Sequence, residues 1–160
     1  MQAQLTELEA DYGIEWQDYR LDDLFEIGTV KSLDEGKLIL VKHKNQADLI
    51  PFVGRTKANN GIKGYVQKQL FDPNPEKVIS ISQIGTLSVQ LRTEKWYASQ
   101  NIFCLNPIEP YKPLFSCFGV TSITKSLESY FSEGYSNYPT LEKLNKMKIK
   151  LPTIRQNGEV

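Results

Sequence analysis

The sequence predicts an α+β fold that is rich in strands, with a central, twisted and mostly antiparallel sheet and helices mainly in the C-terminal part. Three observations lead to this prediction. Short apolar segments, some of them strictly alternating, fill the middle of the chain. Glycine, proline and asparagine separate these segments at close intervals. Long helical spacing of apolar residues begins only after residue 113.

The early part of the chain is predicted to form a helical turn and two strands. The turn covers residues 19–23, because Tyr19, Leu21 and Leu24 are spaced as the apolar side chains of a short helical turn are. Residues 37–41 (KLILV) and residues 48–53 (DLIPFV) are short and apolar, which is typical of strands. Pro51 restricts the second strand to a sheet edge or a strand end, because proline has no N–H to donate.

The middle of the chain is predicted to form a hairpin and a further strand. Residues 77–82 (KVISIS) alternate as a half-buried strand does, and residues 87–92 (LSVQLR) return with the same alternation. A bend at residues 84–86 joins them. The two prolines within residues 71–76 predict a loop, and residues 96–105 supply another strand.

The last part of the chain is predicted to hold the main helices. Residues 114–131 have apolar side chains at helical spacing, and residues 141–147 form a shorter helix. A proline-spaced connector, residues 106–113, precedes the first helix, and a loop at residues 132–139 separates the two. Residues 148–151 form a final strand.

Charge is distributed unevenly, although the net charge is zero. Residues 1–36 hold ten acidic and two basic side chains, whereas residues 37–112 hold eleven basic and five acidic ones. We read residues 1–13 as an acidic leader and residues 14–158 as a single domain, because 160 residues suffice for one core. A basic middle is expected of a protein that binds a polyanion, and a solvated face with scattered lysines is the alternative.

Several classes of protein are disfavoured. The acidic N-terminus has no apolar signal region and no run approaches a membrane span, so we expect a cytoplasmic protein with no membrane partner. Cys104 and Cys117 lie among apolar residues and are predicted to be small core hydrophobes. Two cysteines and one histidine cannot supply four zinc ligands, and we expect no metal site.

No constellation of catalytic residues is found, and we predict a protein that is not an enzyme. The chain has no P-loop and no G-x-G-x-x-G after a strand. His43 lies between lysines, which favours an exposed loop histidine over a general base. Asp22 and Asp23 are neighbours that point apart on a helix, so a helix start suits them better than a metal site.

The most informative segment is residues 50–64, IPFVGRTKANNGIKG. An apolar strand leads into Arg55 and Lys57, and Asn60-Gly61 is typical of a two-residue hairpin turn with positive φ. A stiff turn would hold these cations, a hydroxyl and two amides in solvent. Fixed cations suit phosphates, and fixed amides suit base edges.

Similar side chains recur downstream, and together they form the predicted set of nucleic-acid contacts. Simpler interpretations stay open: solvated loops for the cations, turn formation for the asparagines of residues 59–60, surface hydration for Gln83 and a buried amide for Asn101. The set is Arg55, Thr56, Lys57, Asn59, Asn60, Lys63, Gln83, Thr86, Arg92, Lys95, Tyr97, Gln100, Tyr135, Ser136 and Asn137.

Six blocks carry a resemblance to a known family. They are Trp16 with residues 21–27 (LDDLFEI), residues 50–53 with Arg55-Thr56, residues 59–62 (NNGI), Ile79-Ser80-Ile81 with residues 83–86 (QIGT), residues 97–102 (YASQNI) and residues 149–152 (IKLP). In this order and spacing the chain resembles the target recognition domain of a type I restriction-modification specificity subunit, which related fused enzymes share. The match spans roughly residues 14–158.

The resemblance implies a target-recognition-domain fold that binds duplex DNA sequence-specifically and so specifies the target of a restriction-modification complex. It implies a methyltransferase subunit and a restriction subunit as partners. It implies no cofactor on this chain, with S-adenosylmethionine expected only on the methyltransferase. Two such domains usually alternate with long spacer helices in the family, whereas this chain holds one domain and no spacer helix. Three interpretations stay open: a half-subunit, an excised domain or a truncation. A second specificity half or a homodimer is a further partner that the resemblance allows.

Two other functions are not excluded by the residues. One is a protein-interaction module whose acidic segment, residues 7–26, meets a basic partner. The other is a fragment of a fused restriction-methyltransferase enzyme, which the missing motifs disfavour. Salt separates DNA binding from the first alternative, because contacts to several phosphates weaken steeply as salt rises.

Overall fold

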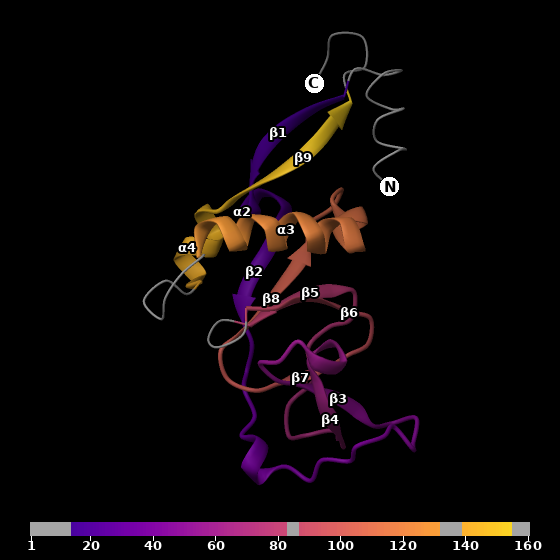
Figure 1. Cartoon of the computed structure of the whole chain (residues 1–160). Coiled ribbons are helices and arrows are strands. Elements are labelled where there is room, and N and C mark those ends of the chain that lie inside the picture. The colour runs from indigo at the N-terminus through magenta and orange to yellow at the C-terminus, as the bar shows by residue number, and fades with distance from the viewer. Residues whose placement is uncertain (1–13, 83–86, 132–138, 155–160) are drawn as a thin grey trace.

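The computed structural model describes residues 14–82, 87–131 and 139–154, and these residues are arranged in layers (Figure 1). From one end to the other, the layers are a two-stranded ribbon, a group of helices, a four-stranded sheet and a three-stranded sheet. The strands are β1 (Ile14–Arg20), β2 (Phe25–Thr29), β3 (Ile50–Val53), β4 (Ile62–Val66), β5 (Val78–Ser82), β6 (Val89–Arg92), β7 (Tyr97–Ala98), β8 (Ile102–Pro107) and β9 (Lys148–Ile154). The helices are α2 (Leu21–Leu24), α3 (Cys117–Tyr130) and α4 (Leu141–Lys146), with 3₁₀ turns η1 (Glu35–Lys37), η2 (Ala58–Gly61) and η3 (Lys112–Leu114).

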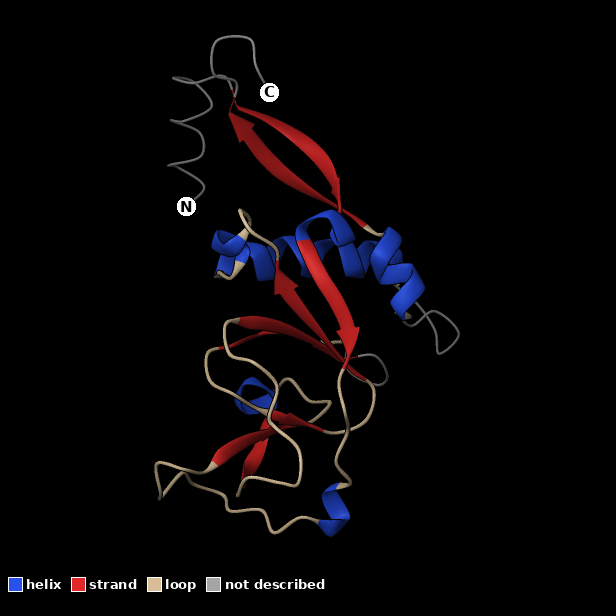
Figure 2. Cartoon of the chain, turned by 180° about the vertical axis from the view of Figure 1, so that it is seen from behind, coloured by secondary structure: helices blue, strands red, loops and turns tan. Residues whose placement is uncertain are grey.

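The four-stranded sheet forms the centre of the fold. Its order is β2-β8-β5-β6, and every neighbouring pair is antiparallel. Figure 2 shows the helices between this sheet and the ribbon. Gly119, Ile123 and Leu127 form the buried stripe of α3, which joins the main core. The predicted α+β class with mostly antiparallel strands and late helices is therefore confirmed, although the strands form three sheets instead of one.

The predicted hairpin of residues 77–82 and 87–92 is confirmed as β5 and β6, with Val78 opposite Arg92 and Ile81 opposite Val89. The prediction of a half-buried strand is wrong, because all five residues of β5 are buried. Ile79 and Ile81 pack towards the helices, whereas Val78 packs on Trp96 in a second core. Alternation thus reveals the two faces of a strand but not that both are covered. The predicted bend at residues 84–86 lies outside the described residues.

The three-stranded sheet has the order β4-β3-β7, with β3 antiparallel to β4 and parallel to β7. Pro51 pairs with Tyr65 of β4, and the pairing with β7 begins only at Phe52. Pro51, the second residue of β3, thus lies where one side of the strand is unpaired, which agrees with the predicted edge position. The single strand predicted at residues 96–105 is wrong. It is divided into β7 and β8 by a turn in which Asn101 has a φ of 63°.

Two early predictions need correction. Residues 37–41 do not form a strand: η1 ends at Lys37, and Val41 makes only an isolated bridge with Tyr65. The helical turn predicted at residues 19–23 begins only at Leu21, because Tyr19 and Arg20 belong to β1, an unpredicted strand that pairs with β9 at the other end of the chain. The hydroxyls of Tyr19 and Thr153, 134 residues apart, lie 2.7 Å from each other across this ribbon. Local periodicity does not reveal a strand whose partner is so distant.

The later predictions agree well with the structure. The helix predicted at residues 114–131 is α3, which Ser116 caps by accepting a hydrogen bond from the Gly119 N–H at 3.2 Å. The helix predicted at residues 141–147 is α4, and the strand predicted at residues 148–151 is β9. Residues 71–76 form a loop apart from a bridge at Asn74, as predicted. The connector after β8 contains η3, and the loop predicted at residues 132–139 lies almost wholly outside the described residues.

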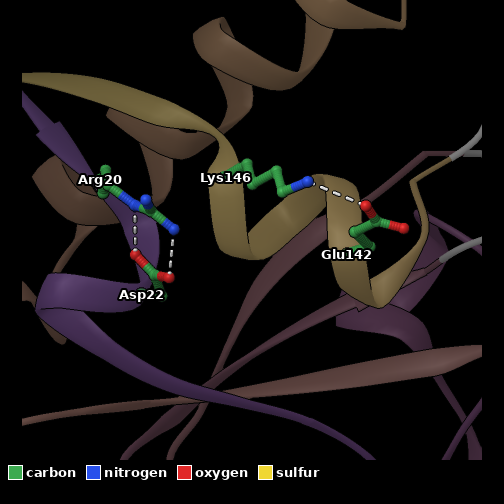
Figure 3. Close-up of polar contacts among 4 residues, drawn as sticks. All are labelled: Arg20, Asp22, Glu142 and Lys146. Carbon is green, nitrogen blue, oxygen red and sulfur yellow. Dashed lines mark hydrogen bonds and ion pairs between the residues drawn. The ribbon is translucent and has the colours of Figure 1, made fainter.

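Exposed ion pairs lie beside two of the helices. Arg20 binds Asp22 through two hydrogen bonds of 2.9 and 2.7 Å, and Lys146 binds Glu142 one turn away at 2.9 Å (Figure 3). The Asp22 hydrogen bond and charge raise the pKa of Arg20, and the Lys146 hydrogen bond lowers the pKa of Glu142. Asp22 and Asp23 occupy the first turn of α2, as the sequence predicted.

The two cysteines differ in burial. Cys104 is half-buried on β8, and burial raises the pKa of its thiol to about 12. Cys117 is exposed at the start of α3, so its predicted core position is wrong. His43 is exposed in a loop, as predicted. Within the described ranges, no helix combines the length and the apolar character needed to cross a membrane.

Candidate nucleic-acid interface

The β3–β4 loop, residues 54–61, contains the segment that the sequence singled out. Its eight residues separate Val53 from Ile62, so the predicted two-residue turn is wrong. The predicted positive φ is confirmed at Asn60 and Gly61, with values of 53° and 76°, and extends to Asn59 at 48°. A hydrogen bond of 2.8 Å from the Gly54 N–H to the Gly61 carbonyl closes the base of the loop. The loop is thus longer than predicted but sharply bent at the expected asparagines.

The polar side chains of the loop also hold its shape. Thr56 Oγ1 accepts a hydrogen bond from the Ala58 N–H at 3.1 Å. The Asn59 amide donates to the Ile62 carbonyl at 3.3 Å, and the Asn60 amide donates to the Leu91 carbonyl of β6 at 3.2 Å. The turn-forming interpretation of both asparagines is therefore confirmed. Their exposed amides are also fixed in position, which is what a recognition surface needs.

A buried guanidinium fixes the loop from beneath. Arg92, at the end of β6, is 3% exposed. It donates hydrogen bonds to Ser80 Oγ at 2.9 Å, to Gln90 Oε1 at 2.6 Å and to the Asn60 carbonyl. Gln90 in turn donates to the Thr56 carbonyl at 3.4 Å. The loop is therefore connected to the four-stranded sheet at two of its own carbonyls.

Burial lowers the pKa of Arg92 to about 10, because desolvation disfavours the charged form. The group remains protonated near neutral pH, and the acceptors around it are neutral oxygens of Ser80, Gln90 and Asn60. Such a charge is tolerated in the interior because it donates hydrogen bonds to these three oxygens. Gly61 packs against the same network, and a Cβ there would collide with Gln90 Oε1.

The cations above this support differ in their surroundings. Arg55 and Lys57 are exposed, and neither forms an ion pair with another described residue. Lys63 lays its aliphatic chain against Gly54 and binds Glu35 at 2.8 Å, with both side chains about 40% exposed. Because exposed ion pairs contribute little to stability, a phosphate could replace Glu35 at small cost.

The strand topology brings some of the predicted contact residues to one end of the three-stranded sheet and separates others from it. Because β3 and β7 are parallel, Gly54 and Gln100 follow strand ends at the same edge of the three-stranded sheet. The Ser99 N–H binds the Val53 carbonyl at 2.9 Å, which keeps Gln100 beside the start of the β3–β4 loop. Lys95 is exposed but precedes β7, so it lies at the opposite end of that strand.

Two residues of the predicted set lie in the interior. Tyr97 is fully buried, and its hydroxyl donates to the Phe71 carbonyl at 2.6 Å and accepts from the Gln69 N–H at 2.9 Å. Arg92 is buried as described above. The surface residues Arg55, Thr56, Lys57, Asn59, Asn60, Lys63 and Gln100 are brought together. Gln83, Thr86, Tyr135, Ser136 and Asn137 lie outside the described residues.

Sequence reasoning missed Gln90, which belongs to the same network as Arg92. The available signal was their spacing, because positions i and i+2 of a strand share one face. Gln90 and Arg92 of β6 lie opposite Ser80 and Val78 of β5, so two polar side chains on this face of the hairpin indicate a buried polar contact. Among the described residues, no group of three or more His, Cys, Asp or Glu side chains is placed to hold a metal ion.

These features define a domain in which a hydrogen-bonded loop presents exposed cations and amides on a β scaffold, as expected of a nucleic-acid-binding domain. Residues 13–159 match the family model described as the type I restriction modification DNA specificity domain. The chain therefore belongs to this family. No match was found among curated proteins.

Solved structures with the same fold include the S subunit of a type I restriction-modification system from M. genitalium, at 18% identity and a TM-score of 0.66. The HsdS subunit from Thermoanaerobacter tengcongensis is 15% identical, with a TM-score of 0.58. A chain from a structure on complex assembly and conformational transition of the type I R-M system is 16% identical, with a TM-score of 0.61. These matches cover 96%, 86% and 86% of this chain and 37%, 33% and 34% of the other chains, so it spans about a third of their length.

Proposed function

We propose that this chain binds duplex DNA in a sequence-specific way and specifies the target of a type I restriction-modification complex. The observation that supports this most directly is the β3–β4 loop, whose exposed Arg55 and Lys57 are mounted on a backbone fixed by Arg92. Membership of the DNA specificity family supports the same function. A preorganised cationic loop binds phosphates with little loss of conformational entropy.

Each surface residue has a role in this proposal. Arg55, Lys57 and Lys63 contact phosphates or guanine edges, and Lys95 contacts phosphate from a separate position. Thr56, Asn59, Asn60 and Gln100 offer hydrogen bonds to base edges or backbone. Gln83, Thr86, Tyr135, Ser136 and Asn137 remain predicted contacts. Arg92 and Tyr97 support the surface from the interior and leave the contact set.

The proposal extends to the complex in which the chain works. The domain is non-catalytic and binds no cofactor of its own, and S-adenosylmethionine belongs to a methyltransferase subunit. That subunit, a restriction subunit and a second specificity half or a second copy are its partners, in the cytoplasm. Target specification then consists of holding one DNA site in register for chemistry performed by another chain.

Selection from a pool of random duplexes tests this function. The purified chain should enrich one short motif, either alone or with a cognate methyltransferase subunit. Affinity for that motif should fall steeply with salt: contact with about four phosphates predicts roughly a hundredfold loss for a fourfold rise in concentration. Enrichment of no motif under either condition would contradict sequence-specific binding. Affinity that does not change with salt would favour the protein-interaction module.

A further inference from the structure

A second basic surface lies at the opposite end of the molecule from the β3–β4 loop. It is a groove of about 670 Å³ between α3 and the β1–β9 ribbon. Figure 1 shows the ribbon and α3 on one side of the four-stranded sheet and β3 and β4 on the other. A ligand in this groove would therefore leave the β3–β4 loop free.

The groove is formed by a second stripe of α3. Phe118 and Tyr130 stand at its two ends, and the lining residues between them recur at three- and four-residue spacing along the helix. This stripe is distinct from the buried stripe of Gly119, Ile123 and Leu127. Twelve residues of helix span about 18 Å, which corresponds to about three turns of a second helix lying alongside. Side chains at this spacing are the ones that a neighbouring helix contacts.

The apolar part of the groove is aromatic and accessible. Trp16 of β1 is 44% exposed and Tyr130 is 56% exposed. The ring centroids of Trp16 and Phe118 lie 6.4 Å apart, so the two rings form one apolar patch across the groove. Aromatic side chains of this kind are enriched at the centre of protein interfaces.

The charged part of the groove is basic. Lys125 of α3 and Lys148 and Lys150 of β9 line it, and Asp18 is the one acidic side chain among its described lining residues. None of the three lysines forms an ion pair with another described residue. Lys148 and Lys150 alternate with the buried Ile149, so both ammonium groups leave the ribbon on the groove side.

We propose that this groove docks one acidic amphipathic helix of a partner protein. The apolar stripe of that helix would cover Trp16, Phe118 and Tyr130, and its carboxylates would pair with Lys125, Lys148 and Lys150. The aromatic patch and the helical spacing favour a protein helix over a nucleic acid, which would need a basic groove that follows its backbone. This proposal does not depend on DNA binding at the other end of the molecule.

Tryptophan fluorescence can report binding in the groove. Trp16 is exposed there, whereas Trp96, the other tryptophan, is fully buried. The probe is a capped peptide of about four helical turns, with leucine at every third or fourth position and glutamate elsewhere. Added to the full chain, it should shift the Trp16 emission to shorter wavelength in a saturable way. The shift should be absent from Trp16→Phe.

Charge variants then locate the site. The triple variant Lys125→Gln, Lys148→Gln and Lys150→Gln should bind the peptide about tenfold more weakly. The matched control is Lys42→Gln, Lys57→Gln and Lys95→Gln, which removes three exposed lysines that lie outside the groove and should leave the peptide affinity unchanged. Circular dichroism should give the same melting temperature for both variants.

Four outcomes would overturn the proposal. The first is that the glutamate peptide causes no saturable shift. The second is that a lysine-for-glutamate peptide binds equally well, or that the groove variant keeps full affinity. The third is that a random duplex causes the shift and loses affinity in the groove variant, which would make the groove a nucleic-acid surface. The fourth is that the peptide binds only after residues 1–12 are removed, which would assign the groove to the acidic leader of this chain.

Discussion

The two basic surfaces of this molecule are supported in opposite ways. The β3–β4 loop is irregular, and the buried guanidinium of Arg92 lies beneath it. The groove is lined by α3 and the β1–β9 ribbon, which are regular elements held by hydrogen bonds within the helix and between the two strands. Among the described residues, Arg92 is the one charged side chain that is buried. An irregular loop leaves carbonyls without partners, and a buried donor is needed to satisfy them.

The comparison explains why the two surfaces should respond differently to mutation. Changes beneath the β3–β4 loop act on both folding and binding, because the same hydrogen bonds serve both. Changes in the groove act on binding alone, because Lys125, Lys148 and Lys150 are exposed and unpaired with other described residues. Four predictions test this difference, and they are given in order from the largest expected effect to the smallest.

Arg92→Met should produce the largest effect. Methionine fills a similar volume but leaves Ser80, Gln90 and the Asn60 carbonyl without their donor. We expect the free energy of unfolding to fall by about 3 kcal/mol, measured by urea denaturation. Arg20→Met is the control, because Arg20 is exposed and Asp22 is its one ion-pair partner among the described residues, and it should leave stability essentially unchanged. Equal stability of Arg92→Met and wild type would refute the supporting role of Arg92.

Arg55→Ala should weaken binding without affecting folding. Loss of a fixed contact to phosphate or guanine should reduce the affinity for the selected DNA site by about 2 kcal/mol. Gel-shift titration measures this change, and the melting temperature should stay the same. Lys125→Ala, in the groove, is the matched control and should bind DNA as wild type does. An unchanged affinity of Arg55→Ala would remove Arg55 from the contact set.

Gly61→Ala tests the backbone of the loop. An alanine at a φ of 76° is strained, and its Cβ would displace Gln90. We expect a loss of about 1–2 kcal/mol in the free energy of unfolding. Gly28→Ala is the control, since a Cβ at Gly28 meets nothing within 4 Å. If both variants were equally stable, the left-handed turn would not be a constraint on this loop.

Glu35→Gln should produce the smallest effect, and in the opposite direction. It removes the carboxylate that binds Lys63 and frees this cation for a phosphate. DNA affinity should increase by about 0.5 kcal/mol, and the increase should vanish at high salt. Glu142→Gln breaks the remote Lys146 pair and should not change DNA affinity. Weaker binding by Glu35→Gln would show that the Lys63–Glu35 pair itself serves recognition.

Much of the fold could be predicted because its signals are local. The alternation of residues 77–82 and 87–92 identified β5 and β6, and helical spacing identified α3. The candidate surface was also largely predictable, since Arg55 and Lys57 stand beside an asparagine-glycine turn. The errors share a cause. Tyr97 and Arg92 are polar residues near strand ends, and only the loops that cover them make them interior.

By itself, the sequence determined the β5–β6 hairpin, the helices α3 and α4, and the positive φ at Asn60 and Gly61, because these features depend on residues that are close neighbours. Only the tertiary structure decided that β1 pairs with β9, that both faces of β5 are covered, and that Arg92 binds the carbonyl of Asn60, 32 residues away. Burial is set by whatever packs on the opposite face. For β5 and Arg92, that packing comes from parts of the chain that no local pattern can identify.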